Sequence, residues 1–158
     1  MSISHLAEDA TQMWRTFMAR PETQVDARLF DVMTIGETAA MADRGAAMVL
    51  TGMKTASATL PAAFGAEGPP PIGSYAIVLD GSGRAVCVVR TESLALVPFR
   101  EIGEDFVHAT GEWDGTVATW RARMTSILAA KAEDHGLDWE ETTEVLCERF
   151  RVVHRAGL

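Results

Sequence analysis

Apolar residues recur at steps of three and four along residues 6–20, which is the spacing of one face of an α-helix. This face consists of Leu6, Ala10, Met13, Trp14, Phe17 and Met18. Pro21 follows at once, and a proline disfavours helical backbone in the residue before it. The pattern predicts a first helix over residues 6–20, followed by irregular chain with one short strand near Leu29–Met33.

A second helix is predicted between Thr38 and Gly52. A threonine hydroxyl can accept a hydrogen bond from the first free amides of a helix, and a glycine readily takes the left-handed conformation that ends one. Residues 61–73 then hold four of the six prolines of the chain. Because proline lacks an amide hydrogen, this stretch is predicted to be a long loop without regular structure.

Short runs rich in β-branched residues come next. Ser74–Asp80 and Arg84–Thr91 are separated by a Gly-Ser-Gly turn, so they are predicted to form a hairpin. A further strand is predicted near Leu94–Pro98. The alternation of apolar and polar positions over residues 144–154 predicts a closing strand.

Two helices are expected between these strands. A short one lies within residues 100–111, and a longer one follows, with Asp114 as its N-terminal cap and Gly136 as its end. Strands joined by hairpins and helices grouped in blocks favour an α+β fold with a mostly antiparallel, curled sheet over a parallel α/β fold. With 158 residues and 47% apolar residues, a single domain over residues 1–158 is expected.

The charge balance limits the partners. Fourteen basic against 22 acidic residues give a formal net charge of −8, which opposes sequence-independent attraction to a phosphate backbone. Binding to DNA is therefore not expected, and any RNA contact must be local. A small or short ligand is favoured.

Cysteine and histidine usage predicts no metal centre and no cofactor. Cys87 and Cys147 lie in apolar runs without a partner at metal-ligand spacing, so both are expected to be buried free thiols. The four histidines, which are His5, His108, His135 and His154, also lack ligand spacing. The absence of a secretory signal pattern and of an apolar run of membrane-spanning length predicts a cytoplasmic location with no membrane partner.

Several segments together resemble the ASCH domain family, small proteins with a β-barrel related to the PUA fold. They are residues 35–60, residues 73–92, residues 97–115, "TVATWR" and "LCERFRVV". The resemblance covers about residues 34–154 and leaves residues 1–20 as an additional N-terminal helix. It implies a PUA-like, curled, mostly antiparallel β-barrel with flanking helices, and a role connected with RNA or modified nucleosides.

Some members of that family hydrolyse N4-acetylcytidine and carry the motif GxKxxTxR together with a distant glutamate. By resemblance, Gly52 and Lys54 match the glycine and the lysine, and Ser57 matches the threonine, which preserves a hydroxyl. Thr59 stands at the arginine position, so one expected cation is missing. Glu112 matches the glutamate. The resemblance thus implies Lys54, Ser57 and Glu112 as catalytic residues.

Amide hydrolysis needs a nucleophile, a group that takes its proton and a donor for the developing oxyanion. Ser57 can supply the first, and Lys54 can be its base if burial lowers the pKa of the amine. Alternatively, Glu112 is the base and Lys54 stays an ammonium that stabilises the oxyanion. The structural alternative is that the charge of Lys54 only complements the helix dipole at a C-terminus, and that the Ser57 hydroxyl only forms a hydrogen bond with the backbone.

Further residues are predicted to bind the substrate: Gly52, Thr55, Thr59, Trp113, Arg149 and Arg151. Trp113 can stack on a base or raise the pKa of Glu112, or it can be plain core. Arg149 and Arg151 share one face of the last strand and can meet phosphates, or can pair with the many acids.

The leading hypothesis is a small hydrolase that cleaves the amide of an acylated, cytidine-like nucleoside. Two alternatives stay open, a non-catalytic RNA-binding or regulatory module that uses Lys54, Arg149 and Arg151, and a metal-dependent ribonuclease. The expected partner is a nucleoside or a short RNA, and the sequence does not determine the oligomeric state.

Overall fold

The structure, a computed structural model, describes residues 8–157. Leu6 and His5, both named above, lie outside the described residues. The helices and strands, in chain order, are α1 (Glu8–Met18), β1 (Leu29–Met33), α2 (Ala39–Leu50), β2 (Ala56–Thr59), the 3-10 segment η2 (Pro61–Glu67), β3 (Tyr75–Leu79), β4 (Ala85–Pro98), the 3-10 turn η3 (Phe99–Glu101), α3 (Glu104–Thr110), α4 (Val117–Asp134) and β5 (Glu144–Arg155).

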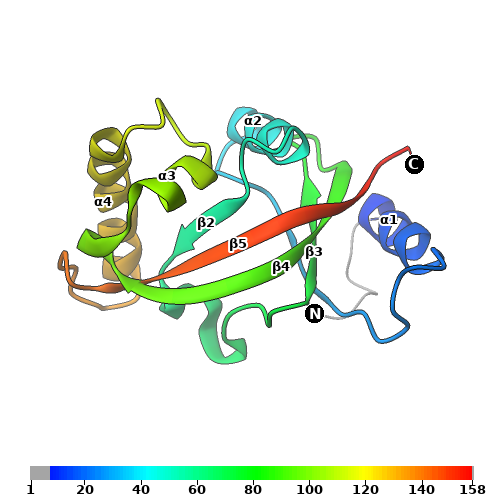
Figure 1. The fold of residues 1–158 in the computed structure, drawn as a ribbon, viewed down its shortest axis with the longest axis horizontal. Helices are drawn as coiled ribbons and strands as arrows, with labels where there is room; N and C mark the ends of the chain where they lie inside the picture. Colours follow the sequence, from blue (N-terminus) through cyan, green and yellow to red (C-terminus); the bar gives the residue numbers. More distant parts are fainter. Residues whose placement is uncertain (1–7, 158) are drawn as a thin grey trace. The chain divides into compact units, whose positions relative to one another are not determined.

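The strands form one mixed sheet in the order β1-β3-β4-β5-β2. Strand β3 pairs parallel with β1 and antiparallel with β4, and β2 pairs antiparallel with β5. The long neighbouring strands β4 and β5 run side by side (Figure 1). The fold is therefore α+β, as predicted. The sheet is open, with β1 and β2 at its edges, so a closed barrel is not confirmed.

The chain divides into two compact units. The first unit comprises the described residues up to Met53, together with Pro70–Glu92 and the residues from Phe150 onward. The second unit comprises Lys54–Pro69 and Ser93–Arg149. Strands β4 and β5 contribute residues to both.

The first unit holds two apolar clusters. In one, helix α1 packs its apolar face on the sheet through Ala10, Met13, Trp14 and Phe17, against Ile77, Ala85 and Val88. In the other, helix α2 and the sheet bury Ala46, Val49, Val78, Cys87, Val89 and Phe150. The sequence pattern of the first helix is therefore explained by burial of one stripe against β3 and β4.

The junction between α1 and β5 is polar. The Arg20 guanidinium donates to the Val153 carbonyl over 2.8 Å and to Nδ1 of His154 over 3.1 Å. Because Nδ1 must accept this bond, the imidazole is neutral with its proton on Nε2. Burial and the facing Arg20 lower the pKa of His154, and the nearby Glu22 opposes them only partly. His154 itself is 5% exposed.

The second unit has a separate aromatic core. Its buried residues come from β2, η3, α3, α4 and β5, and include Phe99, Phe106, Trp120, Met124, Leu128 and Val145. Phe99 stacks on Trp120 at 5.7 Å between ring centroids, and Trp139 meets Phe99 edge-on at 5.0 Å. This core holds α3 and α4 against β2 and the neighbouring part of β5.

Several local predictions are confirmed. The strand at Leu29–Met33 forms with the bounds expected. Helix α2 begins after Thr38, whose hydroxyl accepts from the amide of Met41, and Gly52 takes a left-handed φ of 80° just after its end. The hairpin of β3 and β4 forms around the glycine-rich turn. Cys87 and Cys147 are buried free thiols.

Three local predictions are wrong. The strand near Leu94–Pro98 is not separate but continues β4 to a length of 14 residues, because no glycine or proline interrupts it after Thr91. The proline-rich loop begins with the 3-10 segment η2, where Pro61 supplies a helical φ at the first turn. The cap of α4 is Thr116; Asp114 instead accepts bonds from the amide and hydroxyl of Thr116.

The pKa shift of His154 predicts acid sensitivity. The unfolded chain takes up the histidine proton at a higher pH than the folded chain, so the free energy of unfolding falls as the pH drops through and below about 6.5. We expect His154→Asn, which retains an acceptor but cannot titrate, to lose less stability between about pH 7.5 and pH 5 than the wild type. Urea unfolding at both pH values measures this, and an equal loss in the two proteins would contradict it.

Candidate functional site

Lys54 and Glu112, 58 positions apart in the chain, meet in the second unit. The Lys54 amine lies 3.1 Å from Oε1 of Glu112 and donates a second bond of 3.1 Å to the Thr110 carbonyl. The side chain of Lys54 is 6% exposed and that of Glu112 is 27% exposed. The structure therefore buries the amine and leaves the carboxylate within reach of a ligand.

The end of helix α3 explains why the lysine is held there. The last carbonyls of a helix have no partner inside the helix. Here the Ala109 carbonyl accepts from the amide of Thr55 over 2.7 Å, and the Thr110 carbonyl accepts from Lys54. Gly111 then turns the chain away with a left-handed φ of 66°. The predicted substrate-binding residue Thr55 thus ties the start of β2 to this helix end.

A tight turn presents Glu112. Trp113 has a positive φ of 52°, which no other non-glycine residue among residues 8–157 shows, and such backbone costs energy for a bulky residue. Asp114 holds the far side of the turn through the Thr116 amide and the Thr116 and Thr119 hydroxyls. Trp113 is half-buried against the aromatic core, with the Arg123 guanidinium 5.7 Å from its ring centroid. The carboxylate is therefore placed by a fixed turn.

The environment of Lys54 balances two opposing effects. Burial disfavours the ammonium and lowers its pKa, while the charge and hydrogen bond of Glu112 raise it; the net direction is downward. An ammonium has three N–H bonds. Two point to Thr110 and Glu112, so the third can donate to a bound ligand.

Ser57 has a different place. It lies in β2 opposite Glu148, while its neighbours Ala56 and Ala58 pack in the aromatic core with α3. Because side chains alternate along a strand, Ser57 projects from the other face of the sheet. The hydrogen bonds of the described residues include none that joins Ser57 to Lys54 or Glu112.

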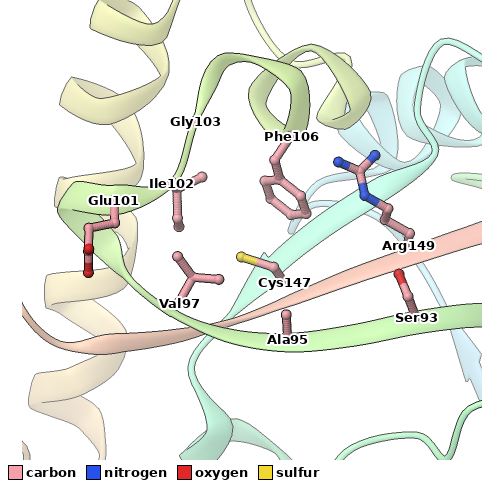
Figure 2. Close-up of a pocket in the computed structure, with 9 residues that line it drawn as sticks. All are labelled: Ser93, Ala95, Val97, Glu101, Ile102, Gly103, Phe106, Cys147 and Arg149. Carbon is pink, nitrogen blue, oxygen red and sulfur yellow. The ribbon is translucent and has the colours of Figure 1, made fainter.

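A pocket of about 240 Å³ lies beneath α3, in the same unit. Strand β4 contributes Ser93, Ala95 and Val97, strand β5 contributes Cys147 and Arg149, and the segment into α3 contributes Glu101, Ile102, Gly103 and Phe106. Figure 2 shows Glu101 and Arg149 at opposite ends of this pocket, with Phe106 and Cys147 between them. The walls are mainly apolar, with charge at the two ends.

Two features set the chemistry of this pocket. The Arg149 guanidinium lies 5.5 Å from the centroid of the Phe106 ring, within cation–π range. Burial raises the pKa of the Cys147 thiol to about 11, so it stays protonated at neutral pH and is not a nucleophile there. The pocket therefore resembles a binding site more than a reaction centre.

Among the other predicted residues, Arg149 lines the pocket and Thr59 lies in β2 opposite Leu146. Gly52 and Arg151 belong to the first unit, where Arg151 pairs with Glu92. Sequence reasoning missed Phe106, Glu101 and the strand residues of β4. The alternation that puts Cys147 and Arg149 on one face of β5 was the only signal that pointed to this pocket.

Two further properties bear on function. No group of three or more His, Cys, Asp or Glu side chains within residues 8–157 is arranged to hold a metal ion. In that same part of the chain, no helix is both long and apolar enough to cross a membrane.

The comparisons with known proteins agree with this fold. The sequence profile of the ASCH domain matches residues 31–154. The structure superposes on an ASCH domain from Lactobacillus crispatus JV V101 with a TM-score of 0.88 at 20% identity, covering 98% of this chain and 100% of that one. A protein from Enterococcus faecalis V583 gives a TM-score of 0.81 at 22% identity and 95% coverage of both chains. A search of curated proteins found no match.

The chain belongs to the ASCH domain family, which is linked to RNA-related functions. Since the solved structures share less than a quarter of their residues with it, they show the fold alone. The α+β, PUA-like architecture expected from the sequence is confirmed at this level.

The ion pair of Lys54 and Glu112 is expected to contribute to the free energy of unfolding. Glu112→Ala should lower the free energy of unfolding by roughly 1–3 kcal/mol, because it leaves the Lys54 ammonium buried without its carboxylate. In a Lys54→Met background the same change should cost much less. Urea unfolding of the four proteins measures the coupling. If Glu112→Ala has the same effect in both backgrounds, the two side chains do not act as a pair.

Proposed function

We propose that this protein hydrolyses the amide of an acylated, cytidine-like nucleoside. The observation that carries the proposal is the buried amine of Lys54 hydrogen-bonded to the more accessible carboxylate of Glu112. A carboxylate beside a desolvated cation can act as a base while the cation stabilises negative charge. Membership of a family linked to RNA-related functions supports a nucleoside substrate.

In the proposed reaction, Glu112 takes a proton from a water molecule, and the oxygen of that water attacks the acyl carbon. The carbonyl oxygen becomes an oxyanion and accepts a hydrogen bond from the third N–H of Lys54. When the tetrahedral intermediate collapses, the C–N bond breaks and Glu112 returns the proton to the leaving amine. The products are a carboxylic acid and the free amino nucleoside.

The geometry favours water over Ser57 as the nucleophile. Lys54 reaches toward α3, as do Ala56 and Ala58, whereas the alternation of β2 directs Ser57 to the other face. A serine needs an adjacent base to attack at neutral pH. Of the two assignments left open by the sequence, the one with Glu112 as base and Lys54 as oxyanion donor is therefore preferred.

RNA binding without hydrolysis is a second candidate, supported by the exposed Arg149 at one end of the pocket. An arginine there can meet a phosphate or a base. Lys54 supports it less, since two of its three N–H groups already donate to Thr110 and Glu112. Metal-dependent cleavage of RNA gains no support from the arrangement of the described side chains.

The test is release of cytidine from N4-acetylcytidine. We expect kcat/KM to fall by about two orders of magnitude or more in Glu112→Gln and in Lys54→Met, since each removes a group that acts in the transition state. Ser57→Ala should stay within roughly tenfold of the wild type. Circular dichroism verifies that each variant is folded.

Glu104→Gln is the matched control, because it neutralises an exposed carboxylate at the start of α3, 3.7 Å from His108 and outside the pocket. It should leave turnover unchanged. Full activity in both the Lys54 and the Glu112 variants would overturn the proposal. A loss in Ser57→Ala as large as that in Lys54→Met would assign the attack to the serine instead.

A further inference from the structure

We infer that the pocket beneath α3 is the nucleoside subsite, which holds a pyrimidine ring beside Phe106 and Arg149 and directs a ribose toward Glu101. This inference rests on the proposed function, because it supplies the part of the site that would hold the rest of the substrate. Neither Lys54 nor Glu112 lines this pocket. It is therefore a distinct recognition element.

The pocket lies at the right place relative to the ion pair. Phe106 and Thr110 are four residues apart in α3, so they lie on one face of the helix, about 6 Å apart along its axis. Phe106 lines the pocket, and Thr110 accepts the hydrogen bond from Lys54. Arg149 pairs across the sheet with Ala56, two residues after Lys54. A ring at the Arg149 end can thus extend its acyl group toward the amine.

The size of the pocket suits a nucleoside. Ser93, Ala95 and Val97 line it from alternate positions of β4 and span about 13 Å at the usual rise of a strand. A volume of about 240 Å³ is small for a ligand site and holds one ring and one sugar, not a folded RNA. A neutral nucleoside also avoids repulsion by the net charge of −8.

The Arg149 end has the chemistry of base recognition. Proteins hold unstacked bases on aromatic rings and on guanidinium planes, and hydrogen-bond their edges. Here the Arg149 guanidinium lies over the Phe106 ring, and its N–H groups can donate to the keto oxygen of a pyrimidine. Cys147 forms an apolar part of the wall, since its thiol stays protonated.

The Glu101 end has the chemistry of sugar recognition. Its carboxylate accepts hydrogen bonds but donates none when ionised, and ribose hydroxyls are donors. Figure 2 shows Glu101 at the end of the pocket opposite to Arg149. Because 2′-deoxyribose lacks one hydroxyl, this end favours ribonucleosides over deoxyribonucleosides.

The experiment measures binding of cytidine, which is the product and needs no hydrolysis to bind. Isothermal titration compares the wild type with Arg149→Ala, which removes the donor, and Ala95→Leu, which fills the pocket. We expect the Kd to rise roughly tenfold or more in each. The matched controls are Lys131→Ala, which makes the same change of charge on α4, and Ala118→Leu, which enlarges an exposed alanine of α4; each should stay within about twofold.

A second binding measurement tests the proposed contact between Glu101 and the ribose. The wild type should bind cytidine more tightly than 2′-deoxycytidine, and Glu101→Ala should reduce the ratio of the two Kd values toward one. Equal effects of the pocket variants and the controls on cytidine binding, or an unchanged ratio in Glu101→Ala, would overturn the inference.

This inference and the proposed function can fail separately. If no N4-acetylcytidine is hydrolysed but cytidine binding depends on Arg149 and Ala95, the pocket assignment stands and the proposed function fails. If hydrolysis depends on Lys54 and Glu112 but kcat/KM is unchanged in Arg149→Ala and Ala95→Leu, the proposed function stands and the pocket assignment fails.

Discussion

The second unit is organised around one buried amine. Lys54 is held at the open end of α3, where the Thr110 carbonyl and the Glu112 carboxylate accept its protons. A buried cation is costly without such partners, so the start of β2, the end of α3 and the turn that carries Glu112 must all be in place together. The turn itself has a positive φ at Trp113 and is held on its far side by the hydrogen bonds of Asp114. The proposed acid–base chemistry rests on the same pair.

In the proposed nucleoside hydrolase, the pocket would bind the substrate and the ion pair would carry out the reaction. The apolar and aromatic walls around Phe106 provide a surface for a flat ring, and the charges at the two ends can orient it. In the proposed function, Lys54 is the oxyanion donor and Glu112 the proton acceptor, and Lys54 is bound by Thr110, four residues after Phe106 in α3. Helix α3 links the two, since it contributes residues to both. In the proposed function, recognition and reaction would thus depend on one helix, and such an arrangement holds a substrate in fixed geometry.

Local structure followed closely from local sequence. The strand at Leu29–Met33, the cap at Thr38 and the left-handed Gly52 depend on a residue and its near neighbours, and all formed as expected. The errors arose where the local sequence contains no clear signal for where an element begins or ends. Nothing between Thr91 and Leu94 ends a strand, so β4 continued, and Pro61 started a 3-10 segment in a stretch expected to be irregular. A curled barrel was implied by family resemblance, and it is not confirmed, since the strand order leaves two edges.

The sequence by itself determined the α+β class, the family, and the two ionisable residues that meet, because motif spacing and family resemblance are properties of residue order. Only the tertiary structure decided what surrounds them. The Thr110 carbonyl carries no side-chain signal, and the pocket requires β4, β5 and α3 to converge. The direction of Ser57 depended on the register and alternation of β2, which a motif read along the chain does not contain. Packing between distant segments sets burial, and burial sets both the pKa of Lys54 and the reach of Glu112.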